Sequence, residues 1–219
     1  MEFLRLVKRN NNREWFAEHK DMYLRAKQTF DNLASDLIAE VSKFDKSCAH
    51  LTLNECVYRF YRDIRFSKDK SPYKTHFGVY ICPQGKKSTW AGYYFHIEPQ
   101  DEETQSCSLL ACGDYMPDKD MLQSIRTDIL LQGDNYLKAI KKAKGFTLDD
   151  YSKLKTLPKG FSPSKYDELI KLKAHLLMKY VDDDFILDKN IVKNVAKAFK
   201  STYDFVSLCN EAFSYSGNY

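Results

Sequence analysis

The spacing of apolar residues changes near Val57, and this change constrains the fold more than any other feature. From Arg13 to about Lys43 they recur at steps of three and four, which predicts one long amphipathic helix. Asn11, with Glu14 three residues later, predicts the N-terminal cap of that helix. From Val57 onward apolar residues alternate instead, which predicts β-strands. We expect four strands, over 57–66, 75–82, 90–98 and 105–112.

The connections between these strands are short, and most of the later chain has helical periodicity. Strands in series with short connections favour an antiparallel sheet over parallel βαβ units. Helices are predicted after Asp118 and from Ile191 to about Phe213, whereas 176–181 is ambiguous and could be a further strand. We therefore predict a single α+β domain over residues 1–219. It would have an antiparallel sheet of about four or more strands, a long N-terminal helix and several C-terminal helices.

Composition restricts the compartment and the chemistry of the chain. The apolar runs are far shorter than the ~20 residues of a membrane span, and the N-terminus lacks the apolar region of a signal peptide. We expect a cytoplasmic protein with no membrane contact. None of the six cysteines forms a C-x-x-C pair. Reduced, mostly buried thiols are therefore predicted rather than disulfides or structural zinc.

The excess positive charge of the chain is concentrated in one segment, Arg59–His76. It carries six Lys and Arg residues against Asp63 and Asp69, and its excess of four equals the net charge of the whole protein. Aromatic residues are interleaved with these cations. Such a segment predicts an anionic partner. We expect a small ligand bearing phosphate or carboxylate, which the following residues would bind: Arg62, Arg65, Lys68, Lys70, Tyr73 and Lys74.

Within this segment, Arg62 falls in register with one face of the predicted strand 57–66, which we expect to be buried and which carries Tyr58, Phe60, Ile64 and Phe66. A buried guanidinium must be paired, either with a carboxylate of the protein or with an anion of the ligand. The first alternative would leave the lysines as an ordinary solvated loop. If the protein is an enzyme, Asp63 and His76 are the acid–base candidates. Two other functions use the same segment, namely single-stranded nucleic-acid binding with Tyr61 and Tyr73 exposed, and docking on an acidic protein surface.

The histidines suggest a second site, which the sequence supports more weakly. In an antiparallel pair of strands, His76 and His96 could meet with Glu98 or Asp63, as a metal or acid–base cluster. The spacing favours a hydrogen-bonded structural His96 instead. We therefore predict no metal and no cofactor. The motifs of P-loop, dinucleotide-binding, α/β-hydrolase, zincin and EF-hand proteins are missing from the sequence, so neither a reaction nor an oligomeric state is assigned.

Four segments occur in a recognisable order: NNNREWF (10–16), YRDIRFSKDKSPYKTH (61–76), AGYYFHIEP (91–99) and LPKGF (157–161). With them the chain resembles a family of conserved hypothetical proteins of unknown function from bacteria and some fungi. The resemblance extends from about Phe3 to beyond Phe199 and implies a single α+β domain. It brings no established activity, so no catalytic residue is carried over. The chain departs from this family at SLLACGDYMP (108–117), where the family tends to have a glycine-rich strand and only Gly113 remains.

Overall fold

The strands form one five-stranded antiparallel sheet, as the alternating pattern predicts. The computed structural model describes residues 1–216, and its strand order is β1-β2-β3-β5-β4. The strands are β1 (Phe77–Ile81), β2 (Gly92–Ile97), β3 (Ser108–Gly113), β4 (Thr147–Leu148) and β5 (Leu176–Val181). The ambiguous segment 176–181 is therefore a strand, and it pairs with β3.

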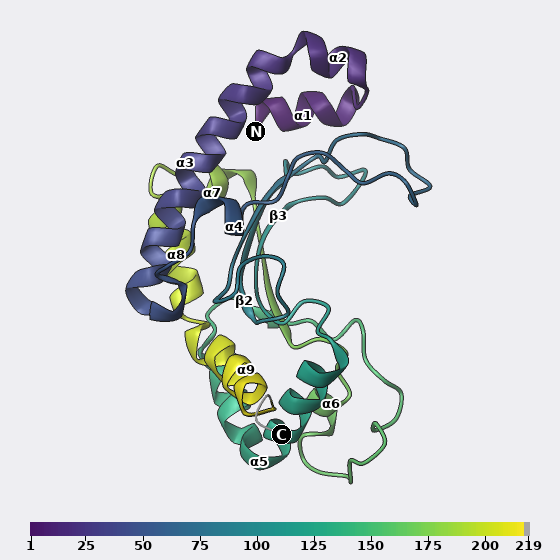
Figure 1. Ribbon diagram of the computed structural model, residues 1–219, viewed down its shortest axis with the longest axis vertical. Helices are drawn as coiled ribbons and strands as arrows, with labels where there is room; N and C mark the ends of the chain where they lie inside the picture. Colours follow the sequence, from purple (N-terminus) through teal and green to yellow (C-terminus); the bar gives the residue numbers. More distant parts are fainter. Residues whose placement is uncertain (217–219) are drawn as a thin grey trace.

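The predicted strand 57–66 is wrong, because this segment forms no continuous strand and contacts the sheet only at its start. Isolated bridges pair Val57 with Val79 and Tyr61 with Tyr73. Between and beyond them the chain is irregular, since Pro72 lacks the N–H that a continued ladder would require. Residues 58–75 form a long hairpin, which we call the basic arm, and Figure 1 shows it projecting beyond the sheet. The alternation nevertheless survives in part, because Phe60 is buried.

The N-terminal helical region contains three helices, α1 (Glu2–Arg9), α2 (Arg13–Glu18) and α3 (Lys20–Phe44). The single helix predicted from Arg13 is interrupted at His19, which has φ −109° and ψ 22°. There the ring Nδ1 of His19 donates to the carbonyl oxygen of Trp15 at 2.8 Å. Two short helices follow α3, η1 (Lys46–Cys48) and α4 (Leu53–Cys56).

The N-terminal cap is also one residue later than predicted. Asn12 caps α2, because its side chain accepts from the backbone N–H of Trp15. Asn11 instead binds the backbone of Tyr73 in the basic arm, donating at 2.9 Å and accepting at 3.1 Å. The segments 10–16 and 61–76, far apart in the sequence, are thus joined by a two-bond clamp.

The C-terminal half is mainly helical. Its helices are α5 (Lys119–Lys142), α6 (Asp167–Ile170), α7 (Asp183–Leu187), α8 (Ile191–Lys200) and α9 (Tyr203–Ser216). The predicted helix 191–213 is two helices, and α5 has a kink at Gln132, where the backbone is not helical. None of the helices in residues 1–216 is both long and apolar enough to traverse a bilayer.

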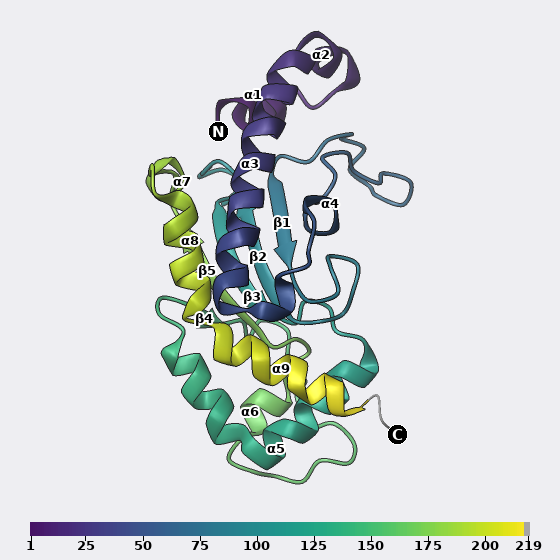
Figure 2. The same ribbon diagram turned by 60° about the vertical axis from the view of Figure 1, so that its left-hand side comes forward.

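The two faces of the sheet differ. Helices α3 and α8 cover one face (Figures 1 and 2), and the core on that side includes Phe77, Val79, Phe95 and Leu110. The other face looks toward the concave side of the molecule in Figure 1, between the basic arm and the region of α5 and α6. We call it the open face. Because side chains alternate along a strand, residues next to the core positions lie on this open face.

Candidate functional site

Three side chains with metal-binding and acid–base chemistry meet on the open face. Phe77 pairs with Ile97 and both are buried in the core, so His76 and Glu98 share the opposite face with His96. The ring centroids of His76 and His96 lie 4.2 Å apart, and Nε2 of His96 lies 3.0 Å from Oε2 of Glu98. One ligand atom from each residue falls within 4.8 Å of the others. We call this group the His–His–Glu cluster.

Two neighbouring hydroxyl groups orient the His–His–Glu cluster. The phenol oxygen of Tyr94 lies 3.0 Å from Nδ1 of His96. On the other side, the hydroxyl of Thr75 donates to Oε1 of Glu98 at 2.7 Å. Each residue of the His96–Glu98 pair therefore has an outer partner that limits its rotation.

A glycine makes room for this arrangement. A Cβ atom added to Gly78 would lie 2.8 Å from the Tyr94 hydroxyl oxygen and 3.1 Å from its ring. The Tyr94 ring therefore lies directly over the Gly78 backbone, which a larger residue would prevent. Tyr94, His96 and Glu98 occupy alternate positions of the segment 91–99, and this period of two already places the three residues on one strand face in the sequence.

The surroundings of the cluster favour the neutral form of His76 and the ionised form of Glu98. Burial, followed by the proximity of His96 and Lys74, lowers the pKa of His76 to about 3. Burial alone would raise the pKa of Glu98, but hydrogen bonds from His96 and Thr75 outweigh it and the pKa lies below its usual value. Within residues 1–216, the His76 ring makes no hydrogen bond, so its nitrogen lone pair is available to a ligand.

Lys74 of the basic arm lies next to His76 of the cluster and has no ion-pair partner in the described part of the chain. The Lys74 ammonium lies 5.2 Å from the centroid of the Tyr58 ring, which in turn meets the Tyr94 ring edge to face. Burial lowers the pKa of Lys74, and Arg59 lowers it further. Neither Lys74 nor Arg59 forms an ion pair with any carboxylate in the described part of the chain. Arg59 was not among the residues selected from the sequence.

The two other arginines of the arm are neutralised by its own acids. Arg62 binds the Asp69 carboxylate and donates to the carbonyl oxygen of Ser71 at 3.1 Å. Arg65 holds Asp63 with two hydrogen bonds, of 3.0 and 2.7 Å. Bonds from Arg65 lower the pKa of Asp63 to about 2, and bonds from Ser71 and then Arg62 do the same for Asp69. Arg62 is therefore paired with a protein carboxylate, in the arm rather than in the core.

The remaining residues selected from the sequence are dispersed. Lys68 and Lys70 are exposed, and the Lys70 ammonium donates to the carbonyl oxygen of Ile64 at 3.0 Å. Tyr73 is buried and stacks on Phe16, with 3.9 Å between ring centroids. Asp63 is bound to Arg65, whereas His76 belongs to the His–His–Glu cluster, so these two acid–base candidates do not act on each other. Phe66, predicted on the buried face, is 96% exposed.

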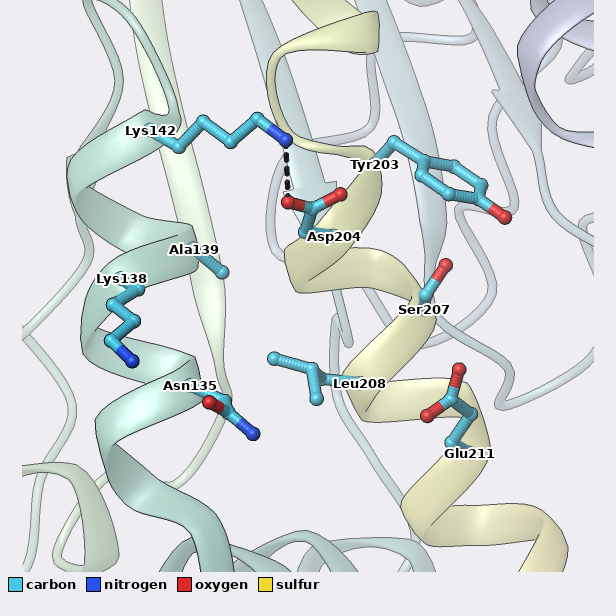
Figure 3. Close-up of a pocket in the computed structure, with 9 residues that line it drawn as sticks. All are labelled: Asn135, Lys138, Ala139, Lys142, Tyr203, Asp204, Ser207, Leu208 and Glu211. Atoms are coloured by element: carbon cyan, nitrogen blue, oxygen red, sulfur yellow. Dashed lines mark hydrogen bonds and ion pairs between the residues drawn. The ribbon is translucent and has the colours of Figure 1, made fainter.

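A separate groove of about 420 Å³ lies between α5 and α9, remote in sequence from both the arm and the cluster. Figure 3 shows Lys142 of α5 reaching Asp204 of α9, with 2.6 Å between Nζ and Oδ2. The other side chains that line it are mixed in charge: Asn135, Lys138, Ala139, Tyr203, Ser207, Leu208 and Glu211. Because its charges offset one another and no set of donors converges, this groove is a weaker candidate than the open face.

Comparison with known proteins supports the resemblance drawn from the motifs. A family model described as conserved hypothetical protein (DUF2461) matches residues 1–207. This match confirms the family expected from the sequence and spans the sheet, the arm and the cluster. Neither the curated proteins nor the solved structures provide a match.

Proposed function

The chain belongs to the conserved hypothetical protein family DUF2461, and we propose that it binds a small anionic ligand, bearing phosphate or carboxylate, at the base of the basic arm. The observation that carries this proposal is Lys74, a half-buried cation next to His76 that has no ion-pair partner in the described part of the chain. Burial lowers the pKa of Lys74, which means that burial destabilises its charged form, and a bound anion would remove that penalty.

Arg62 and Arg65 are expected to contribute less to anion binding, because each is already paired with an acid of the arm. A ligand would have to displace Asp69 before it could take the full bidentate geometry of Arg62, and the same holds for Asp63 and Arg65. Lys68 and Lys70 add positive potential from the arm at longer range. Of the two acid–base candidates, His76 is the one next to Lys74, whereas Asp63 is held by Arg65.

The test is calorimetric titration of metal-free protein with pyrophosphate and with citrate. Lys74→Met keeps the apolar stem against Tyr58 and removes the charge, so the affinity should fall by about 10- to 100-fold, the usual worth of a charged hydrogen bond. Lys68→Met is the matched control, because it removes a lysine of the same segment at an exposed position. The proposal fails if neither anion binds, or if both variants lose the same affinity.

One observation favours a second function, the binding of single-stranded nucleic acid. The exposed Phe66 ring lies 5.9 Å from the Arg65 guanidinium carbon, and Tyr61 is also exposed. Exposed rings beside cations suit base stacking with phosphate contact, although the buried Tyr73 cannot serve as a second platform. Fluorescence anisotropy with a labelled oligothymidylate should then show binding that weakens steeply with salt and is lost in Phe66→Ala. Binding that is absent, or unaffected by Phe66→Ala, removes this function.

A further inference from the structure

We propose that His76, His96 and Glu98 bind one divalent transition-metal ion on the open face. This site is distinct from the anion site and does not depend on it. It also replaces the sequence-based prediction that no metal is bound. Two imidazoles and one carboxylate are a donor set used for zinc, iron(II) and related first-row ions, and they leave coordination positions open.

The distances require only a small closure around an ion. Ligand atoms about 2.1 Å from a metal lie roughly 3–3.5 Å from one another. The Nε2 of His96 and Oε2 of Glu98 are already 3.0 Å apart, and all three ligand atoms lie within 4.8 Å. His76 is the ligand that must approach, and its ring has no hydrogen bond within residues 1–216 to hold it back.

The outer partners are those that a metal site needs. A metal-bound histidine usually donates its second N–H to an oxygen atom, and a metal-bound carboxylate is usually hydrogen-bonded as well. With Nε2 of His96 on the metal, its proton resides on Nδ1 and the Tyr94 oxygen, at 3.0 Å, accepts it. Thr75 holds the second oxygen of Glu98 at 2.7 Å. Gly78 provides the space that lets Tyr94 reach this position.

Charge also favours a cation between these residues. Without a metal, the half-buried Glu98 carboxylate has His96 as its ion-pair partner, and the pair is charged on both sides only when His96 is protonated. A divalent ion would neutralise Glu98 at any pH that leaves the imidazoles unprotonated.

The simpler interpretation is that Glu98 and His96 form a structural hydrogen bond and nothing more. The two interpretations differ for His76, which makes no hydrogen bond to Glu98 or to His96. A purely structural pair gives no reason for metal affinity to depend on His76. A metal site requires all three residues.

The experiment is the titration of metal-free full-length protein with CoCl₂ in chloride buffer, followed by calorimetry and by visible absorption. One Co²⁺ per chain is expected. His76→Asn, His96→Ala and Glu98→Gln should each weaken binding by more than the ~10- to 100-fold typical of an outer partner, whereas Tyr94→Phe should fall within that range. His50→Ala is the matched control, because His50 is exposed and outside the cluster, and it should bind like the wild type.

Each result decides the proposal, provided that circular dichroism confirms the fold of every variant. The absence of Co²⁺ binding overturns it, as does binding that survives His76→Asn and Glu98→Gln. If His96→Ala does not fold, these two variants still give the answer. Lys74→Met should retain Co²⁺ affinity. A protein that binds Co²⁺ but not pyrophosphate would therefore support the metal site and refute the anion site, and the converse result would do the opposite.

Discussion

The basic arm and the open face of the sheet contrast in how clearly the sequence marks them and in how much chemistry the structure leaves available there. The arm has the densest charge of the chain, yet Arg62 and Arg65 are bound by Asp69 and Asp63 of the same segment. The open face brings together His76, His96 and Glu98 from positions up to 22 apart in the sequence. Thr75 and Tyr94 hold Glu98 and His96 in place, and the His76 ring still has no hydrogen-bond partner in the described part of the chain.

This contrast shows that charge density in a sequence does not measure available charge. In a compact loop, an acidic residue a few positions from an arginine can reach it, so the two side chains form an ion pair with each other. A site on a sheet is different, because residues two apart on one strand lie on one face and the register adds a third from the next strand. Four predictions test this contrast, from the largest expected effect to the smallest.

The arm itself contains an anchored and an unanchored aromatic residue, although the alternating pattern placed both on a buried face. Phe60 is 4% exposed and packs against Phe3, Phe16, Tyr23 and Phe77, whereas Phe66 is 96% exposed. Phe60→Ala should lower the free energy of unfolding by about 3–5 kcal/mol because it leaves a cavity. Phe66→Ala should change it by less than ~0.5 kcal/mol. Urea denaturation measures both, and similar losses would mean that the arm is packed differently.

Gly78→Ala tests the support of the open face. The new Cβ would collide with the Tyr94 hydroxyl group, and moving that ring should cost about 1–3 kcal/mol of folding free energy. It should also break the bond from Tyr94 to His96 and weaken Co²⁺ binding by about 10-fold. In Tyr94→Phe the colliding oxygen is gone, so the two changes combined should destabilise the protein less than the sum of the single ones. Additive effects would separate Gly78 from the site.

Asp69→Asn tests whether the ion pair with Asp69 keeps Arg62 from binding an anion. Removal of the carboxylate frees the Arg62 guanidinium, so pyrophosphate affinity should rise by roughly two- to five-fold, the range expected of an exposed pair. Calorimetry on the metal-free variant measures this, with Glu103→Gln as a control that removes one exposed acid without freeing an arginine. An equal gain in both variants would attribute the effect to net charge alone.

The smallest effect is the titration of the arm's carboxylates. The pKa of Asp63 and of Asp69 is about 2, below the ordinary value of 3.8. A lowered carboxyl pKa means that the bonds to these carboxylates, from Arg65 to Asp63 and from Ser71 and then Arg62 to Asp69, contribute stability above the ordinary pKa. This contribution is lost as the pH falls through about 2. Carboxyl carbon NMR shifts should therefore show both midpoints near pH 2. Midpoints near 3.8 would show that the arm's ion pairs do not form in solution.

The periodicity of the sequence predicted the sheet and the helical regions well but located several boundaries wrongly. Alternation identified the strands that became β1, β2 and β3, because these strands have a buried face. It failed for 57–66, where burial alternates around Phe60 but the partner segment contains Pro72 and cannot continue a ladder. It also missed the interruption at His19, which preserves the apolar stripe while the backbone leaves helical geometry.

The site was harder to predict for a physical reason. His96, Glu98 and Tyr94 could be assigned to one face from their spacing, but the contact with His76 depends on the register of β1 against β2, which no local pattern determines. The pairing of Arg62 with Asp69 depends on the path of an irregular loop. Sequence reasoning therefore favoured the residues of highest charge and gave the cluster of His76, His96 and Glu98 only as a weaker alternative, whereas the structure brings these three residues together.

The central claim is that the functional site of this protein is the His–His–Glu cluster on the open face, rather than the charged tip of the arm. Crystals grown with Co²⁺ and measured at the cobalt absorption edge test it most directly. We predict one anomalous peak about 2.1 Å from Nε2 of His96, a ring nitrogen of His76 and a carboxylate oxygen of Glu98. Crystals in which these three residues carry no peak, or in which cobalt binds elsewhere and leaves them unchanged, would contradict the account.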